Sequence, residues 1–205
     1  MRSLAPIMAG LGRLSCLWAA DRGDLFHGWG LLQMNVHMLS PSDAVQYRHV
    51  MLHAYRHAAD AFTSTPQERA AESLSWWANR LGSVDGLSVA FGVRAGDALT
   101  GVLALAFSSR TKTRHKALLV GMYVMPDWRG QGLARALIRA ALAHAQAREH
   151  ITVVQLEVTE GNVAAIALYQ SLDFQSYGVE PMAVLTPTGY RNKVHMWLEL
   201  NRPYG

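Results

Sequence analysis

The chain has 205 residues, of which half are hydrophobic and 17% are charged, so its composition predicts a packed core rather than disorder. The formal net charge of +4 is scattered along the chain, and no stripe of Lys and Arg interleaved with aromatic residues indicates a nucleic-acid partner. The single cysteine, Cys16, excludes an internal disulfide framework and a cysteine-based zinc cluster, so we expect a cytoplasmic protein.

The first 33 residues precede a regular alternation of predicted elements. Arg2, an apolar stretch and small residues outline a weak signal peptide, but Arg13 interrupts the apolar centre. No uninterrupted apolar run of about 18 residues is present, so no membrane partner is expected. We interpret residues 1–33 as an N-terminal extension, or as the result of a start codon placed too early, and residues 34–205 as the domain.

The domain begins with a short strand candidate at residues 35–39, followed by two predicted helices. Ser40 has the position of a helix N-cap, and the helix after it is expected to run to about Ala59. Thr65 opens a cleaner capping box and predicts one helix to about Leu81.

Strand-like runs at 87–95 and 100–109 then predict a hairpin. The remaining predicted elements are strand, helix, strand, helix, strand and strand, at residues 116–125, 133–148, 152–158, 162–172, 175–180 and 193–200. A long loop around Pro187 and Gly189 is expected between the last two strands. The order β-α-α-β-β-β-α-β-α-β-β predicts an α/β fold, a mixed sheet with helices on both faces.

The segment "MPDWRGQGLAR", residues 125–135, joins a predicted strand to a predicted helix. The first turn of a helix presents N–H groups that have no internal partner, and the helix dipole makes that end partly positive. Gly130 and Gly132 let an anion approach the backbone, while Arg129 and Arg135 add charge. A phosphate fits such a loop. A dinucleotide fingerprint fits poorly because Arg135 replaces its third glycine, and a structural turn without a ligand is the other alternative.

A second motif, "LEVTEGNVAAIALYQSLDF" at residues 156–174, gives this loop a context. Together the two motifs resemble the GNAT superfamily of N-acetyltransferases, in particular its ribosomal-protein-alanine-type members. The segment Arg129-x-x-Gly132-x-Ala134 is similar to the acetyl-CoA motif of that family, and Asp173 replaces a glycine that is usual in the second motif. The resemblance spans roughly residues 36–200 and implies the GNAT acyl-CoA N-acyltransferase fold, a three-layer sandwich, for an N-acetyltransferase domain at 34–205.

The resemblance also implies acetyl-CoA as the cosubstrate and no metal. Its pantetheine arm would pair with the backbone of Met122, Tyr123 and Val124, and Asn162 would contact the arm while capping a helix. The pyrophosphate would be bound by Arg129, Gly130, Gln131, Gly132, Leu133, Ala134 and Arg135.

Two residues have catalytic roles by the same resemblance. Glu157 would be the general base that deprotonates the amine, with Glu160 as its rival and a solvated surface carboxylate as the alternative. Tyr169 lies two helical turns after Asn162 and would protonate the departing thiolate, or it is a packed aromatic residue of the helix.

The predicted reaction is transfer of an acetyl group from acetyl-CoA to a primary amine, either a small molecule or a protein N-terminus. Direct attack in a ternary complex is expected because no core cysteine can carry the acetyl group. A non-catalytic acyl-CoA-binding module, acting as a sensor or interaction domain, is the alternative, and a homodimer is left open. His49, His53 and His57 share a helix face but lack an acidic or cysteine partner, so we interpret them as a solvated stripe rather than a metal site.

Overall fold

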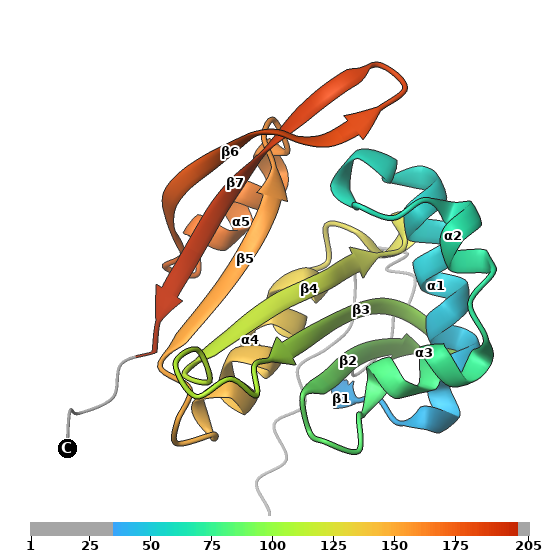
Figure 1. The fold of residues 1–205 in the computed structure, drawn as a ribbon. Coiled ribbons are helices and arrows are strands. Elements are labelled where there is room, and N and C mark those ends of the chain that lie inside the picture. The colour runs from blue at the N-terminus through green and yellow to red at the C-terminus, as the bar shows by residue number, and fades with distance from the viewer. Residues whose placement is uncertain (1–34, 201–205) are drawn as a thin grey trace, which may run out of the picture. The chain divides into compact units, whose positions relative to one another are not determined.

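The computed structural model describes residues 35–200, so the predicted extension at 1–33 lies outside the described residues. Seven strands in this part of the chain form one sheet in the order β1-β2-β3-β4-β5-β7-β6 (Figure 1). The strands are β1 (Val36–Met38), β2 (Ser88–Ala95), β3 (Ala98–Phe107), β4 (Lys116–Val124), β5 (Val153–Thr159), β6 (Gln175–Thr186) and β7 (Gly189–Glu199). The helices are α1 (Ala44–His57), α2 (Pro66–Ala70), α3 (Leu74–Leu81), α4 (Leu133–Gln146) and α5 (Val163–Gln170).

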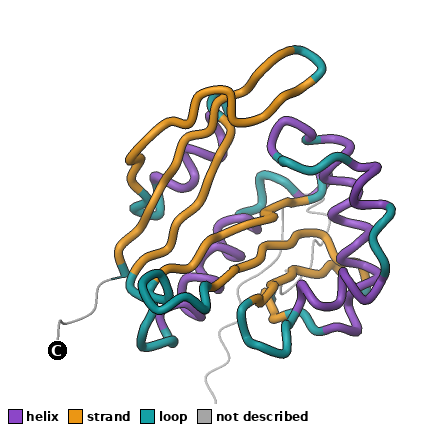
Figure 2. Tube along the Cα trace, in the orientation of Figure 1, coloured by secondary structure: helices purple, strands orange, loops and turns teal. Residues whose placement is uncertain are grey.

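Helices cover both faces of this sheet (Figure 2). On one face α1 and α3 pack on β2, β3 and β4 around the fully buried side chains of Tyr47 and Trp77. On the other face α4 and α5 pack on the sheet around a second cluster that includes Leu137, Ile138 and Leu156. All strand pairs are antiparallel except β4 with β5. The predicted mixed sheet between two helical layers is confirmed.

The single helix predicted between Thr65 and Leu81 is wrong, because the chain breaks into α2 and α3. Thr65 caps α2 as expected, and its side chain accepts from the N–H of Glu68. Ser73 then caps α3, since its Oγ accepts a hydrogen bond from the N–H of Trp76 at 3.2 Å. A second N-cap inside the predicted helix therefore starts a new helix.

The long loop predicted around Pro187 and Gly189 is also wrong. Strands β6 and β7 form one long hairpin, in which Thr186 pairs with Gly189 across a two-residue turn. The pairing register shifts twice along the hairpin, and one shift absorbs Pro181, which cannot donate to a ladder. Within this bulge Met182 has a φ of 54°, and its N–H donates to Asn192 Oδ1 at 2.9 Å. The bulge thus lets the strand continue past a residue that would end it.

The central strand β4 contains a bulge at the point where it stops pairing with β5. Its parallel ladder with β5 runs from Lys116 to Leu119 and goes no further. On its other edge the register with β3 shifts, so that two β4 residues, Gly121 and Met122, oppose one β3 residue. Gly121 has a φ of 63°, in the left-handed region. A bulge bends its strand, and Figure 1 shows β4 and β5 diverging beyond their paired start.

We expect Gly121→Ala to destabilise the protein, because an alanine in the left-handed conformation costs about 1 to 2 kcal/mol. A Cβ at this position would lie 3.6 Å from Met51 Cε, an ordinary contact, so conformation rather than crowding sets the loss. Gly82→Ala is the matched control, since Gly82 has a φ of −172° and no atom within 4 Å of a new Cβ. Urea unfolding measures both, and equal stabilities for the two variants would contradict the assignment.

Candidate active site

The loop before α4 has the backbone conformation of an anion cradle. Gly130 and Gly132 have φ values of 73° and 79°, which only glycine adopts without strain. Gly132 is the N-cap of α4, and the first turn of that helix contains no acidic residue. A Cβ on either glycine would meet no atom within 4 Å, so the space in front of the helix is open. The N–H groups of the first turn can therefore take an anion.

Both arginines of this loop bind the protein itself. Arg129 Nε donates to the carbonyl oxygen of Val124 at 3.0 Å, and its guanidinium group lies 5.3 Å from the centroid of the Tyr123 ring. Arg135 donates to Ser171 Oγ at 2.8 Å and so joins α4 to the end of α5. A guanidinium group has further N–H donors, and their use on a pyrophosphate stays a prediction.

The divergence of β4 and β5 contains a cavity of about 340 Å³. Four of the residues singled out from the sequence line it, namely Met122, Glu157, Asn162 and Tyr169. Tyr123 and Val124 are buried beside it, and the loop residues 129–135 lie outside its lining. The structure therefore brings the two predicted catalytic residues together and separates them from the predicted pyrophosphate loop.

Tyr169 projects from α5 toward β4. Its side chain is 5% exposed, and its hydroxyl donates to the sulfur of Met122 at 3.7 Å. Burial raises the pKa of Tyr169, so the phenol is neutral at physiological pH.

Helix α5 begins after Asn162, whose Oδ1 accepts from the N–H of Ala165 at 3.2 Å, as expected for a cap. Asp173 follows the helix with a φ of 67°, the conformation that favours the glycine it replaces.

Glu157 lies on β5 with its carboxylate bound to a lysine that the sequence analysis missed. Lys193 Nζ donates to Glu157 Oε2 at 3.0 Å, and His195 Nδ1 is 4.0 Å from Oε1. The lysine side chain is 9% exposed and the glutamate 39%, so the charged pair is half-buried. Lys193 and His195 are two residues apart on β7 and so share a face, but only the pairing of β5 with β7 brings them to Glu157. Glu160, the rival base, accepts from Asn192 at 2.8 Å instead.

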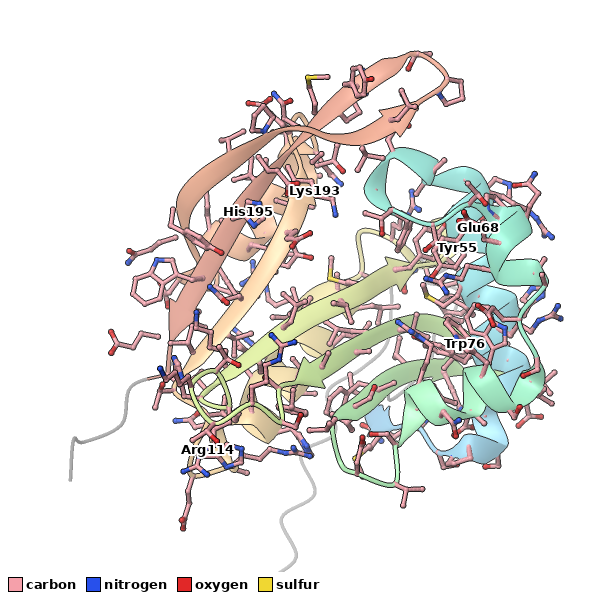
Figure 3. All side chains as sticks on the ribbon, in the orientation of Figure 1. Tyr55, Glu68, Trp76, Arg114, Lys193 and His195 are labelled. Atoms are coloured by element: carbon pink, nitrogen blue, oxygen red, sulfur yellow. The ribbon has the colours of Figure 1, made fainter. Side chains whose placement is uncertain are left out.

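The other side of the cavity consists of α1, α2 and α3 side chains that the sequence analysis did not select. Tyr47 and Tyr55 come from α1, Arg69 from α2 and Arg80 from α3. The guanidinium groups of Arg69 and Arg80 each lie 4.6 Å from the centroid of the Trp76 ring. Figure 3 shows Tyr55 and Trp76 on this helical side, across from Lys193 and His195.

The histidine stripe of α1 is part of the support of β4. His53 Nδ1 forms a 3.0 Å hydrogen bond with the Tyr123 hydroxyl and its ring stacks on His57 at 3.9 Å. Burial, followed by the adjacent His57, lowers the pKa of His53, so its ring is mostly neutral near pH 7.

Within residues 35–200, no cluster of His, Cys, Asp or Glu is arranged to hold a metal ion. No helix in this part of the chain is long and apolar enough to cross a bilayer.

The sequence is similar to those of known acetyltransferases. The profile of the acetyltransferase (GNAT) family matches residues 51–174. Mycothiol acetyltransferase of Thermobispora bispora is 48% identical over 59 residues, which cover 29% of this chain and 20% of that protein. The ribosomal protein bS18-alanine N-acetyltransferase of Escherichia coli is 32% identical over 96 residues, 47% of this chain and 64% of that protein. This chain therefore matches less than two thirds of the length of each relative.

A solved structure has the same fold. The structure of yncA from Salmonella typhimurium with its cofactor acetyl-CoA matches with a TM-score of 0.68 and 22% sequence identity. The match covers 84% of this chain and 97% of that one. At this identity the likeness concerns the fold, that is, the arrangement of helices and strands.

We expect Glu157→Gln to lower the free energy of unfolding by about 1 to 2 kcal/mol, because it leaves the half-buried Lys193 ammonium without a charged partner. In a Lys193→Met background the same change should cost less than about 0.5 kcal/mol, since no charge is left unpaired. Urea unfolding of the four proteins gives the coupling. Equal losses in both backgrounds would show that the pair contributes nothing to stability.

Proposed function

This chain belongs to the acetyltransferase (GNAT) family, whose profile matches residues 51–174, more than half of its length, and we propose that it transfers an acetyl group from acetyl-CoA to a primary amine. The single observation that carries the proposal is the cavity in the divergence of β4 and β5, which Glu157 and Tyr169 both line. A carboxylate and a neutral phenol on one cavity are an acid and base pair of the kind that acyl transfer needs.

Acetyl-CoA would enter this divergence with its pyrophosphate at the start of α4. The glycine conformations of the loop and the absence of acid in the first turn of α4 support that position for the anion. The β4 edge beyond Leu119 does not continue the ladder with β5, so its backbone groups are available to the pantetheine arm. Asn162, which caps α5 with its Oδ1, keeps its amide N–H groups for the same arm.

The proposed reaction is direct attack by the neutral amine on the thioester carbonyl. Glu157 accepts the proton of the amine, directly or through a water molecule, while the new C–N bond forms. The tetrahedral intermediate then breaks its C–S bond, and the electron pair stays on sulfur. The Tyr169 hydroxyl gives its proton to that sulfur, and both side chains return to their starting states by proton exchange with solvent.

The relatives indicate the range of acceptors. One relative is named for acetylation of a ribosomal-protein alanine and another for mycothiol. The names of these relatives therefore point to both proteins and small molecules as acceptors. A primary amine acceptor is the chemistry that we propose here, and the Lys193–Glu157 pair supports it because the lysine fixes a carboxylate beside the cavity.

Two measurements test the proposed function against a non-catalytic acyl-CoA-binding module. Acetyl-CoA at 100 times its Kd should raise the free energy of unfolding by about 2.7 kcal/mol, whether or not catalysis occurs. Thiol release in the presence of a panel of primary amines should occur only if an acetyl group is transferred. Stabilisation without amine-dependent thiol release would overturn the enzyme and leave the binding module.

Tyr169→Phe should lower kcat by about 10²-fold with little change in the KM for acetyl-CoA, because it removes the proton for the leaving sulfur. Tyr177→Phe is the matched control, since Tyr177 is exposed and lies outside the cavity. Because burial raises the pKa of Tyr169, wild-type kcat should show no fall from its ionisation up to pH of about 10. Steady-state thiol release over a pH series measures both effects, and an unchanged kcat in Tyr169→Phe would remove the acid role.

A further inference from the structure

We infer that the amine acceptor carries an acidic group, a carboxylate or a similar oxyanion, that Arg69 and Arg80 bind on the helical side of the cavity. This inference rests on the proposed acetyl transfer and specifies its acceptor class. The two arginines come from α2 and α3, the helices that the sequence predicted as one, and both line the same cavity as Glu157 and Tyr169.

The first support is the charge balance of the cavity. Its lining contains three cationic side chains, Arg69, Arg80 and Lys193, and a single carboxylate, that of Glu157. Glu157 is already bound by Lys193, so no carboxylate of the lining neutralises the arginines. Arg80 makes no ion pair within residues 35–200, and Arg69 has one, a 3.6 Å contact with Glu72 at the surface. An acceptor with only a positive group would be repelled by this wall, whereas an acid group would be attracted.

The second support is that the arginines are held in place before any ligand binds. Trp76 stacks with both guanidinium groups, each 4.6 Å from its ring centroid, and Ser64 Oγ accepts from Arg69 at 2.6 Å. Side chains that are already ordered lose little entropy on binding, and planar guanidinium groups suit bidentate binding of a carboxylate.

The donors of Arg69 are also not saturated by the protein. Its Nε is buried without a hydrogen-bond partner within the described residues, and the other two such nitrogens, on Trp77 and His144, lie outside the cavity lining. An unpaired buried donor costs free energy unless something in the functional complex compensates for it. This places the incomplete hydrogen bonding on the wall where the acid group is proposed.

Two tyrosine hydroxyls and the size of the cavity also bear on the acceptor. We call the side of the cavity formed by Tyr47, Tyr55, Arg69 and Arg80 the acceptor wall. Tyr47 and Tyr55 lie beside Arg80 and Arg69, and burial raises the pKa of Tyr47 to about 12, so its hydroxyl remains a neutral donor for an oxyanion. A cavity of about 340 Å³ is at the small end of ligand sites, and acetyl-pantetheine must share it. A small amino acid, or the first residues of a peptide, is therefore the size of acceptor that fits.

The experiment compares acceptors that differ only in the acid group. The full chain at saturating acetyl-CoA is given α-amino acids, their α-carboxamides, and tripeptides with a free N-terminus that have Glu or Gln at the second position. Thiol release gives kcat/KM for each. We expect each acid to exceed its amide by at least about tenfold, because a site with charged donors rejects the analogue that lacks their partner. The amino-acid and tripeptide pairs show which source supplies the acid.

Two variants assign that preference to the arginines. Arg80→Met and Arg69→Met should each reduce the acid preference at least about tenfold, with the KM for acetyl-CoA unchanged. Arg80→Lys keeps the charge and should retain part of the preference, which also covers the case in which a methionine variant does not fold. Arg114→Met is the matched control, because Arg114 is exposed on a loop at the far end of the molecule from Trp76 (Figure 3).

The outcomes separate this inference from the proposed function. Amides used as well as acids, with clear amine-dependent turnover, would overturn the acid group and keep the acetyltransferase. A raised KM for acetyl-CoA in Arg69→Met and Arg80→Met, with unchanged acceptor preference, would overturn it as well by assigning the arginines to the cosubstrate. No thiol release with any amine would overturn the proposed function, and this inference with it.

Discussion

The rest of the structure depends on where β4 stops pairing with β5. The two strands must be joined at their start, because Leu119, Val154 and Leu156 are buried there in the core. Past Leu119 the bulge at Gly121 turns β4 away, and β5 keeps its partner β7 on its other edge. The sheet therefore remains continuous while its centre opens. Backbone groups along the opening have no ladder partner, and buried polar groups of this kind are satisfied by solvent or by a ligand. The same feature that costs the sheet hydrogen bonds opens the cavity that we propose as the binding site.

Charge is distributed around this opening in an order that suits the proposed reaction. Arg69 and Arg80 line its helical side, and the α4 N-terminus, which we propose for the pyrophosphate, lies outside the cavity lining. The same cavity is lined by the two groups proposed for proton transfer, Glu157 and the neutral Tyr169. The carboxylate is partly exposed and the phenol is buried, so the two groups suit the different roles of base and acid. An acid group bound by the two arginines would hold the acceptor in the cavity that Glu157 and Tyr169 line.

Local sequence signals predicted most elements because capping residues and periodicity act over a few positions. Thr65 and Asn162 lie at the helix starts where the sequence placed them, and Ser40 caps a 3-10 helix at Pro41–Asp43 that leads directly into α1. Long-range contacts could not be predicted in this way. Lys193 reaches Glu157 only through the pairing of β5 with β7, and the order of strands in a sheet is not contained in local sequence signals. Arg69 and Arg80 were not selected from the sequence, although spacings of seven and four residues from Trp76 would put all three on one face even of a continuous helix.

Arg129 shows how the two substrate regions share one support. Sequence alone suggested a rim charge for a phosphate, whereas its Nε binds the carbonyl of Val124 at the end of β4 and its guanidinium group lies over Tyr123. The Tyr123 hydroxyl in turn bonds to His53 of α1, the helix that supplies Tyr47 and Tyr55 to the acceptor wall. The loop proposed for the pyrophosphate is thus connected to α1 through two side-chain contacts, Arg129 with Tyr123 and Tyr123 with His53. Direct transfer requires both substrates to be held in one geometry, where small displacements cost large factors in rate. The contacts of Arg129, Tyr123 and His53 at the end of β4 can hold both substrate regions in a fixed geometry, as the proposed direct transfer requires.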